Sequence, residues 1–131
     1  MDPTSKQKLA SRFNPIVDSY GREHRSLRIS VTDRCNIRCF YCMPENVKFL
    51  PQESILSFEE IRQVVEILAR HGVNRVRITG GEPLVRSEIW NLVSQLKSVS
   101  GIDEVALTTN GILLLDQAQK LRDSGLDRIN V

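Results

Sequence analysis

Apolar and polar residues alternate with a period of two positions in several short segments of the chain. The alternation covers residues 27–32, 73–79 and 105–108, and a fourth apolar segment begins at Ile129. A period of two is typical of β-strands, because successive side chains of a strand point to opposite faces of a sheet. The sequence therefore predicts three complete strands and the beginning of a fourth.

Three other segments repeat their apolar residues with the period of an α-helix. The first follows Ser57-Phe58-Glu59-Glu60, which has the pattern of a capping box, and ends at His71-Gly72, where glycine suits the left-handed position after a helix. Helices are also predicted over residues 87–98 and 114–124. The expected buried stripes consist of Ile61, Val64, Val65 and Leu68 in the first helix and Ile89, Leu92, Val93 and Leu96 in the second.

Strand and helix thus alternate three times before the fourth strand. Such alternation is typical of βαβ units and predicts an α/β fold with a parallel sheet and outer helices. In such folds the chemistry gathers at the carboxyl ends of the strands. The segments at these ends are a cysteine-rich stretch after the first strand, Gly80-Gly81-Glu82-Pro83 after the second and Thr108-Thr109-Asn110-Gly111 after the third. We therefore expect one site built from three successive loops.

Composition and charge narrow the possible functions. A chain of 131 residues with 40% hydrophobic and 26% charged residues is typical of one globular domain. The net charge of +2 does not indicate a nucleic-acid or membrane partner, and no apolar run approaches the roughly 20 residues of a membrane span.

Residues 1–20 are interpreted as a tail or arm with a short helix near Gln7–Phe13, and residues 21–131 as the core domain.

All three cysteines lie in one short segment, with the spacing Cys35-x3-Cys39-x2-Cys42. An odd number of thiols so close together cannot form disulfides only, but a compact loop can direct all three sulfurs toward a soft metal or an iron–sulfur cluster. Because the chain has no fourth cysteine, a cluster would keep one iron open, as catalytic metal sites do. Clustered thiols without an apolar secretion signal also indicate the cytoplasm.

The cysteines allow two other interpretations. A structural zinc site completed by His24 or His71 is one, although neither histidine has finger-type spacing from the cysteines. Three unrelated buried cysteines are the other, although chance clustering of all three, flanked by Arg34 and Arg38, is improbable. The iron–sulfur interpretation is favoured over both.

Two arginines occupy the polar positions of the first two predicted strands. Arg28 lies opposite the apolar residues of its strand, and Arg77 lies between Val76 and Ile78. An arginine inside a barrel is costly unless it meets an anion, and guanidinium groups suit phosphate oxygens. From the residues alone, solvent-facing arginines remain an equal alternative. No Walker-type phosphate loop is present.

The cysteine spacing, with the aromatic Tyr41 before the last cysteine, resembles the signature of the radical S-adenosylmethionine (radical SAM) enzymes. The likeness extends from about Tyr20 to Val131. Within that superfamily the chain resembles the MoaA branch, the GTP 3′,8-cyclases of molybdenum-cofactor biosynthesis. The strings that carry this likeness are Leu27-Arg28-Ile29-Ser30-Val31-Thr32-Asp33-Arg34 before the cysteines, Thr79-Gly80-Gly81-Glu82-Pro83-Leu84, and Leu107-Thr108-Thr109-Asn110-Gly111.

The resemblance implies a set of cofactors and their ligands. It assigns a [4Fe–4S] cluster to Cys35, Cys39 and Cys42, with S-adenosylmethionine on the open iron. It places Tyr41 beside the adenine, and Gly81 and Glu82 at the methionine end of the cofactor. One electron from the cluster would cleave the sulfonium and give a 5′-deoxyadenosyl radical, while the protein would position and shield the reaction.

The resemblance also implies a substrate, a reaction and a larger fold. It assigns GTP to Arg28, Arg77 and Thr108, and predicts that the radical abstracts hydrogen from the ribose C3′ before that carbon attacks C8 of guanine. The fold implied is a partial (β/α)6 TIM-like barrel, of which this chain would supply the first half. An electron donor and a homodimer of the full-length enzyme are further expectations.

Members of this branch carry a second cysteine triad near the C-terminus, and no cysteine follows Cys42 here. We therefore expect this chain alone to lack complete cyclase activity. Two rival functions remain. Another radical SAM enzyme, such as a peptide-modifying one, is disfavoured by the extended strings and the paired arginines. A non-enzymatic metal-binding module with structural zinc would be distinguished by metal analysis.

Overall fold

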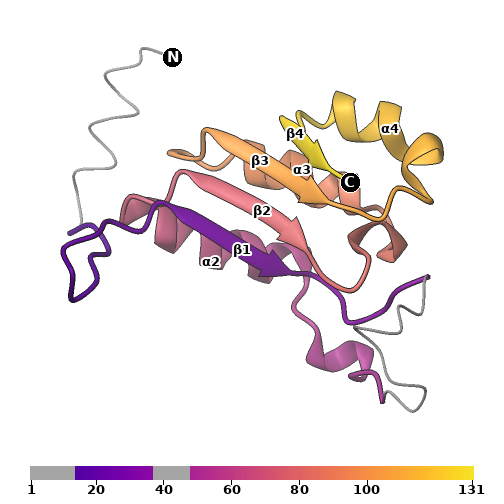
Figure 1. Cartoon of the computed structure of the whole chain (residues 1–131), viewed down its shortest axis with the longest axis horizontal. Coiled ribbons are helices and arrows are strands. Elements are labelled where there is room, and N and C mark those ends of the chain that lie inside the picture. Colours follow the sequence, from indigo (N-terminus) through magenta and orange to yellow (C-terminus); the bar gives the residue numbers. More distant parts are fainter. Residues whose placement is uncertain (1–13, 37–47) are drawn as a thin grey trace.

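A computed structural model describes residues 14–36 and 48–131 of the chain. Its centre is a sheet of four parallel strands in the order β1-β2-β3-β4, so that neighbours in sequence are also neighbours in space (Figure 1). The strands are β1 (Ser26–Ser30), β2 (Arg75–Thr79), β3 (Glu104–Thr108) and β4 (Arg128–Asn130). The predicted α/β fold with parallel strands is confirmed, and each predicted strand is present within a few residues of its expected position.

One helix follows each of the first three strands. The helices are α2 (Phe58–Arg70), α3 (Ile89–Lys97) and α4 (Leu114–Asp123), and two short 3-10 turns precede α2 and α3, η1 (Gln52–Ser54) and η2 (Pro83–Val85). Figure 1 shows α2 and α3 behind the sheet. Each β-helix-β unit therefore brings the chain back to the carboxyl end of the sheet, where the next loop begins.

The helix ends follow from local sequence. The Ser57 side chain accepts a hydrogen bond from the Glu60 backbone N–H at 3.1 Å, and the Glu60 carboxylate accepts one from Ser57 N at 2.8 Å, which confirms the capping box. Gly72 follows α2 with φ of 95°, a left-handed conformation that glycine adopts without strain. Helix α3 begins two residues later than predicted because Glu88 itself is left-handed, with φ of 56°.

The core lies between the helices and the apolar face of the sheet. Helix α3 contributes its whole predicted stripe, since Ile89, Leu92, Val93 and Leu96 are all fully buried. In α2 the prediction was wrong for Val64, which is 44% exposed. The α2 stripe instead follows the i, i+4 and i+8 positions, which are Ile61, Val65 and Ala69, and Val64 lies at its edge.

The segment before β1 packs against the amino-terminal end of the sheet. Ile16 N donates to His71 O at 3.3 Å, and the His71 ring Nδ1 lies 2.9 Å from Asn14 O. Val17 and Glu23 form an isolated antiparallel bridge. The helix predicted at Gln7–Phe13 lies outside the described residues. Each helix within the described part of the chain is too short or too polar to cross a membrane.

Candidate functional site

The first two loops at the carboxyl end of the sheet are joined through their backbones. Beyond β1, Val31 N donates to Thr79 O at 3.0 Å. Gly81 N then donates to Thr32 O, and Glu82 N donates to Arg34 O, both at 2.8 Å. These bonds extend the pairing of β1 and β2 past the ends of the strands. They hold the chain in place up to Arg34, the residue immediately before Cys35.

The two glycines of the second loop are explained by this close approach. A Cβ atom added to Gly81 would lie 2.3 Å from the backbone oxygen of Arg34, and one added to Gly80 would lie 2.7 Å from that of Thr32. Carbon atoms do not approach backbone oxygens this closely, so only glycine fits at both positions. Gly81, predicted to contact S-adenosylmethionine, therefore already has a structural reason to be glycine, and its cofactor contact stays a prediction.

The third loop is attached through the buried side chain of Glu82, which is 1% exposed. One carboxylate oxygen accepts hydrogen bonds from the Thr109 hydroxyl at 2.5 Å and from Leu84 N at 3.2 Å. The other accepts from Asn110 N at 2.8 Å. A buried carboxylate needs such donors to compensate for the loss of water. Glu82 thus links the second and third loops, and its contact with the methionine end of S-adenosylmethionine stays a prediction.

Asn110 connects the third loop to the cysteine loop. Its side-chain Nδ2 donates to Asn36 Oδ1 at 2.8 Å and lies 4.0 Å from Cys35 Sγ, while its Oδ1 accepts from Ile112 N at 3.1 Å. Sequence reasoning noted the Thr108–Gly111 segment but gave Asn110 no role. The available signal was its place at the end of a strand, directly before a glycine.

Of the three predicted cluster ligands, the structure describes only Cys35, which is half-buried at the carboxyl end of β1. Cys39, Tyr41 and Cys42 lie outside the described residues. Among residues 14–36 and 48–131, no three side chains of histidine, cysteine, aspartate or glutamate group closely enough to hold a metal ion.

The histidines considered as zinc ligands lie at the other end of the sheet. His24 precedes β1 and is 3.3 Å from Asp18, and His71 precedes β2 and contacts Asn14. Cys35 follows β1. In a parallel sheet all strands begin at one end of the sheet and finish at the opposite end. The described positions therefore do not support a zinc site that combines Cys35 with either histidine.

The face of the sheet opposite the core carries the two predicted arginines. Arg28 and Arg77 are register partners on adjacent strands, which confirms that they share a face. Both line an open cavity of about 330 Å³. Sequence reasoning missed two further arginines that line it. The full lining consists of Ser26, Leu27, Arg28, Arg75, Val76, Arg77, Glu104, Ala106 and Arg128.

The charge of this cavity is strongly positive. Among the described residues that line it, four are arginines and one, Glu104, is acidic and pairs with Arg128 at 3.2 Å. Arg75 could have been found from the sequence, because it stands two positions before Arg77 and so has the same strand parity. Thr108, the third predicted GTP contact, is exposed at the end of β3 and does not line this cavity.

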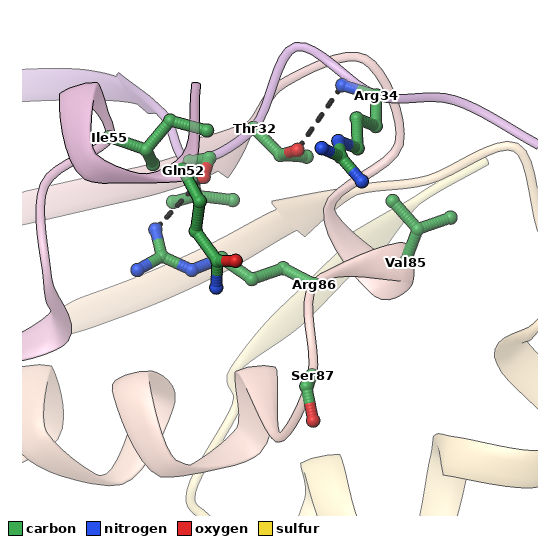
Figure 2. A pocket seen from close by; sticks show the side chains of 8 residues that line it. Thr32, Arg34, Gln52, Ile55, Val85, Arg86 and Ser87 are labelled. Carbon is green, nitrogen blue, oxygen red and sulfur yellow. Dashed lines mark hydrogen bonds between the residues drawn. The ribbon is translucent and has the colours of Figure 1, made fainter. Parts of the chain in front are cut away.

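A second cavity of about 190 Å³ lies beside the end of β1, and Figure 2 shows the side chains around it. The Arg86 guanidinium donates to Val31 O at 2.9 Å and to Leu56 O at 2.7 Å, and it stacks over the Phe58 ring. Burial lowers the pKa of Arg86, against the opposing effect of Glu59. Arg86 therefore joins the end of β1 to the segment that precedes α2.

Comparison with known proteins extends these observations. The chain is 53% identical over 118 residues to a GTP 3′,8-cyclase of Rhodopirellula baltica and 50% identical over 117 residues to one of Lactiplantibacillus plantarum. Each alignment covers 88% of this chain, but 33% and 35% of the two relatives. The chain thus spans about a third of the length of the curated relatives it matches.

A solved structure of BtrN in complex with AdoMet and 2-DOIA shares the fold, with a TM-score of 0.60 at 18% identity. The similarity covers 82% of this chain and 45% of BtrN. The model of the radical SAM superfamily matches residues 29–131, which include the cysteine segment and both following loops. The chain therefore belongs to the radical SAM superfamily, whose members use a [4Fe–4S] cluster and S-adenosylmethionine.

Proposed function

We propose that the chain is the radical SAM portion of a GTP 3′,8-cyclase, an enzyme that in its full-length form converts GTP to (8S)-3′,8-cyclo-7,8-dihydroguanosine 5′-triphosphate for molybdenum-cofactor biosynthesis. The observation that carries the proposal is the in-register pair Arg28 and Arg77, on the sheet face that the helices leave uncovered. The pair lies in the same sheet whose carboxyl end presents the three motif loops. The relatives at 50–53% identity, which are GTP 3′,8-cyclases, add independent support.

The paired arginines suit the triphosphate of the substrate. Two like charges on directly opposed positions of neighbouring strands destabilise a sheet unless an anion lies between them. Guanidinium groups bind phosphate oxygens through two parallel N–H bonds, so the pair provides several such donors at one place. Arg75 lines the same cavity and adds positive charge to it. Thr108, farther along toward the loops, is assigned to the nucleoside part of GTP.

The residues present fit the cofactors of the superfamily. The donor set is three thiols with no fourth cysteine in the chain, which suits a cluster with one open iron. The described member, Cys35, lies at the carboxyl end of β1 with an amide N–H directed at its sulfur. We assign the cluster to Cys35, Cys39 and Cys42, and the S-adenosylmethionine contacts to Tyr41, Gly81 and Glu82.

When bound, the cluster and S-adenosylmethionine supply the one-electron chemistry that creates a carbon radical. The chain's own residues hold and shield the reactants. The arginines fix the phosphates, and the loops fix the cysteines relative to the open sheet face. An external one-electron donor must reduce the protein, because cleavage of S-adenosylmethionine to a carbon radical consumes one electron. Thiols in such a site persist in a reducing compartment, which supports the cytoplasm as the location.

The proposal is tested by anaerobic reconstitution with iron and sulfide. The wild-type protein should bind one [4Fe–4S] cluster and, with a strong reductant, cleave S-adenosylmethionine to 5′-deoxyadenosine and methionine. Replacement of Cys35, Cys39 or Cys42 by Ala should abolish both the visible absorption and the cleavage.

His71→Ala is the matched control, because it removes a possible zinc ligand at the other end of the sheet and should leave the cluster intact. Stoichiometric zinc without iron and sulfide would contradict the proposal and favour a structural metal module.

A further inference from the structure

The contacts among the three loops point to a role for Asn110 that goes beyond the ligands assigned above. The chain between the cysteine loop and β3 is long, with 74 positions separating Asn36 from Asn110, yet their side chains are in direct contact. The same Asn110 amide group is within reach of the Cys35 sulfur. These contacts place an N–H donor beside the first cysteine of the cluster motif.

Asn110 is held in a defined orientation from both sides. Its backbone N–H donates to the Glu82 carboxylate at 2.8 Å, and its side-chain oxygen accepts from Ile112 N at 3.1 Å. With the oxygen occupied in this way, the amide nitrogen points to the cysteine loop. The orientation of the donor is therefore fixed by residues that do not themselves contact the cysteine.

Glu82 is in turn fixed by its own buried environment. Its carboxylate is 1% exposed and accepts three hydrogen bonds, two of them from the third loop. The backbone of the second loop, which contains Glu82, is hydrogen-bonded to Thr32 and Arg34. The second loop therefore contacts both the cysteine loop and the third loop. Glu82 therefore acts as the rigid link through which the third loop is aligned with the cysteine loop.

We propose that Asn110, aligned by Glu82, is a positioning residue that donates an N–H hydrogen bond to the Cys35 sulfur and holds Cys35 and Asn36 against the loop that follows β3. The proposal rests on the assignment of the cluster to Cys35. A donor beside a cluster sulfur stabilises the reduced state, because reduction adds negative charge to the sulfurs. The bond should therefore raise the reduction potential of the cluster and slow the loss of iron.

Two variants separate this role from general damage to the fold. Asn110→Ser retains a side-chain oxygen that can accept from Ile112 N, but its side chain is too short to reach Cys35 or Asn36. Glu82→Gln retains volume, but its amide has only one acceptor oxygen, so either Leu84 N or Asn110 N loses its acceptor. The first variant removes the donor, and the second weakens the set of hydrogen bonds that aligns it.

A matched control is available on the same side of the molecule. The Gln117 amide donates to Leu84 O at 3.0 Å, so it is also a side-chain amide that ties a helix to the second loop. It makes no contact with the cysteine loop among the described hydrogen bonds. Gln117→Ala should therefore leave the cluster properties unchanged.

The test is a redox titration followed by electron paramagnetic resonance, together with the rate of iron release to a chelator, on anaerobically reconstituted protein. Asn110→Ser should lower the midpoint potential and release iron about 10-fold faster, because losing an outer partner of a metal ligand typically lowers metal affinity by about 10-fold or more. Glu82→Gln should shift both quantities in the same direction.

The possible outcomes are distinct. If wild-type protein assembles no cluster, the proposed function fails, whatever the variants do. If wild-type protein assembles a cluster while both variants keep its potential and iron-release rate, the role of Asn110 is refuted and the proposed function stands. If Asn110→Ser fails to fold, Asn110→Asp removes the same N–H donor and keeps the oxygen that accepts from Ile112 N, and an unchanged potential and iron-release rate in it would refute the proposal.

Discussion

The two faces of the sheet are built from alternate residues of the same strands, yet they have opposite character. On the face toward the helices, Val76, Ile78 and Leu107 are buried at 1% exposure or less. On the other face, Arg28 and Arg77 lie side by side and line an open cavity. Adjacent residues of one strand, such as Arg77 and Ile78, therefore have different roles: one is available to a ligand and the other packs in the core.

The difference shows that fold and function can be tested separately within one strand. Apolar side chains on the helix face stabilise the protein in proportion to the surface they remove from water. On the open face Arg28 is exposed and Arg77 is half-buried, and the mutual repulsion of the two arginines opposes folding. Substitutions on the two faces should therefore change different measured quantities, even at adjacent positions.

The largest effect is expected for Ile78→Ala. Ile78 is fully buried in the core, so its truncation should lower the free energy of unfolding by about 2–5 kcal/mol. Its neighbour provides the matched variant, because the half-buried Arg77 lies outside the core and Arg77→Ala should lower that free energy by only about 1 kcal/mol or less. Denaturant unfolding of both variants measures the difference. Equal destabilisation by the two substitutions would refute the division between the faces.

A smaller loss of unfolding free energy is expected for a substitution in the second loop, at the carboxyl end of the sheet. Gly81→Ala would place a Cβ against the Arg34 backbone oxygen, and relief of that clash should cost about 1–3 kcal/mol. The displaced segment is the one that leads into Cys35, so cluster assembly should also become less efficient. Unfolding curves and iron content check the two effects. Wild-type stability in this variant would show that the backbone at Gly81 is not held as close to Arg34 as described.

The smallest effect is expected at the β4 edge, where Asp127 joins β4 to β3 and α3. Burial raises the pKa of Asp127, but hydrogen bonds from Val105 N at 2.8 Å and Lys97 Nζ at 2.9 Å outweigh it and lower the pKa below its ordinary value. A lowered pKa in the folded state stabilises the protein above the unfolded-state pKa, and this contribution is lost as pH falls through the folded-state pKa.

Asp127→Asn should therefore be less stable than wild type near neutral pH, and the difference should shrink as pH falls below about 4. Unfolding measured at several pH values checks the trend. A stability difference that stays constant from pH 7 to pH 3 would argue against the ionised carboxylate as the cause.

The elements and the polar face were predictable because their causes are local in the sequence. The period of two in residues 73–79 placed Arg77 opposite Ile78, and the Ser57–Glu60 spacing set the start of α2. Val64 was misplaced because periodicity gives the direction of a helical stripe but not its width. The width depends on how α2 sits against its neighbours.

The links within the site were not predictable, because they join residues far apart in the chain. Glu82 meets Asn110 across 28 positions, and Asn110 meets Asn36 across 74. The sequence showed only that these residues follow successive strands. Their distances depend on how three loops pack together, and no local pattern encodes that packing. Arg75, by contrast, was missed although its parity matches that of Arg77.

The most direct test of the central claim is a binding titration of the reconstituted protein with GTP, guanosine and S-adenosylmethionine. If the open face binds phosphate, Arg28→Ala and Arg77→Ala should each weaken GTP binding roughly 10–100-fold, as expected for lost charge-assisted hydrogen bonds. Their affinities for guanosine and S-adenosylmethionine should remain near wild type, and the exposed Arg122→Ala on α4 serves as the charge-matched control. Unchanged GTP affinity in both open-face variants would contradict the account and make these arginines ordinary solvent-facing residues.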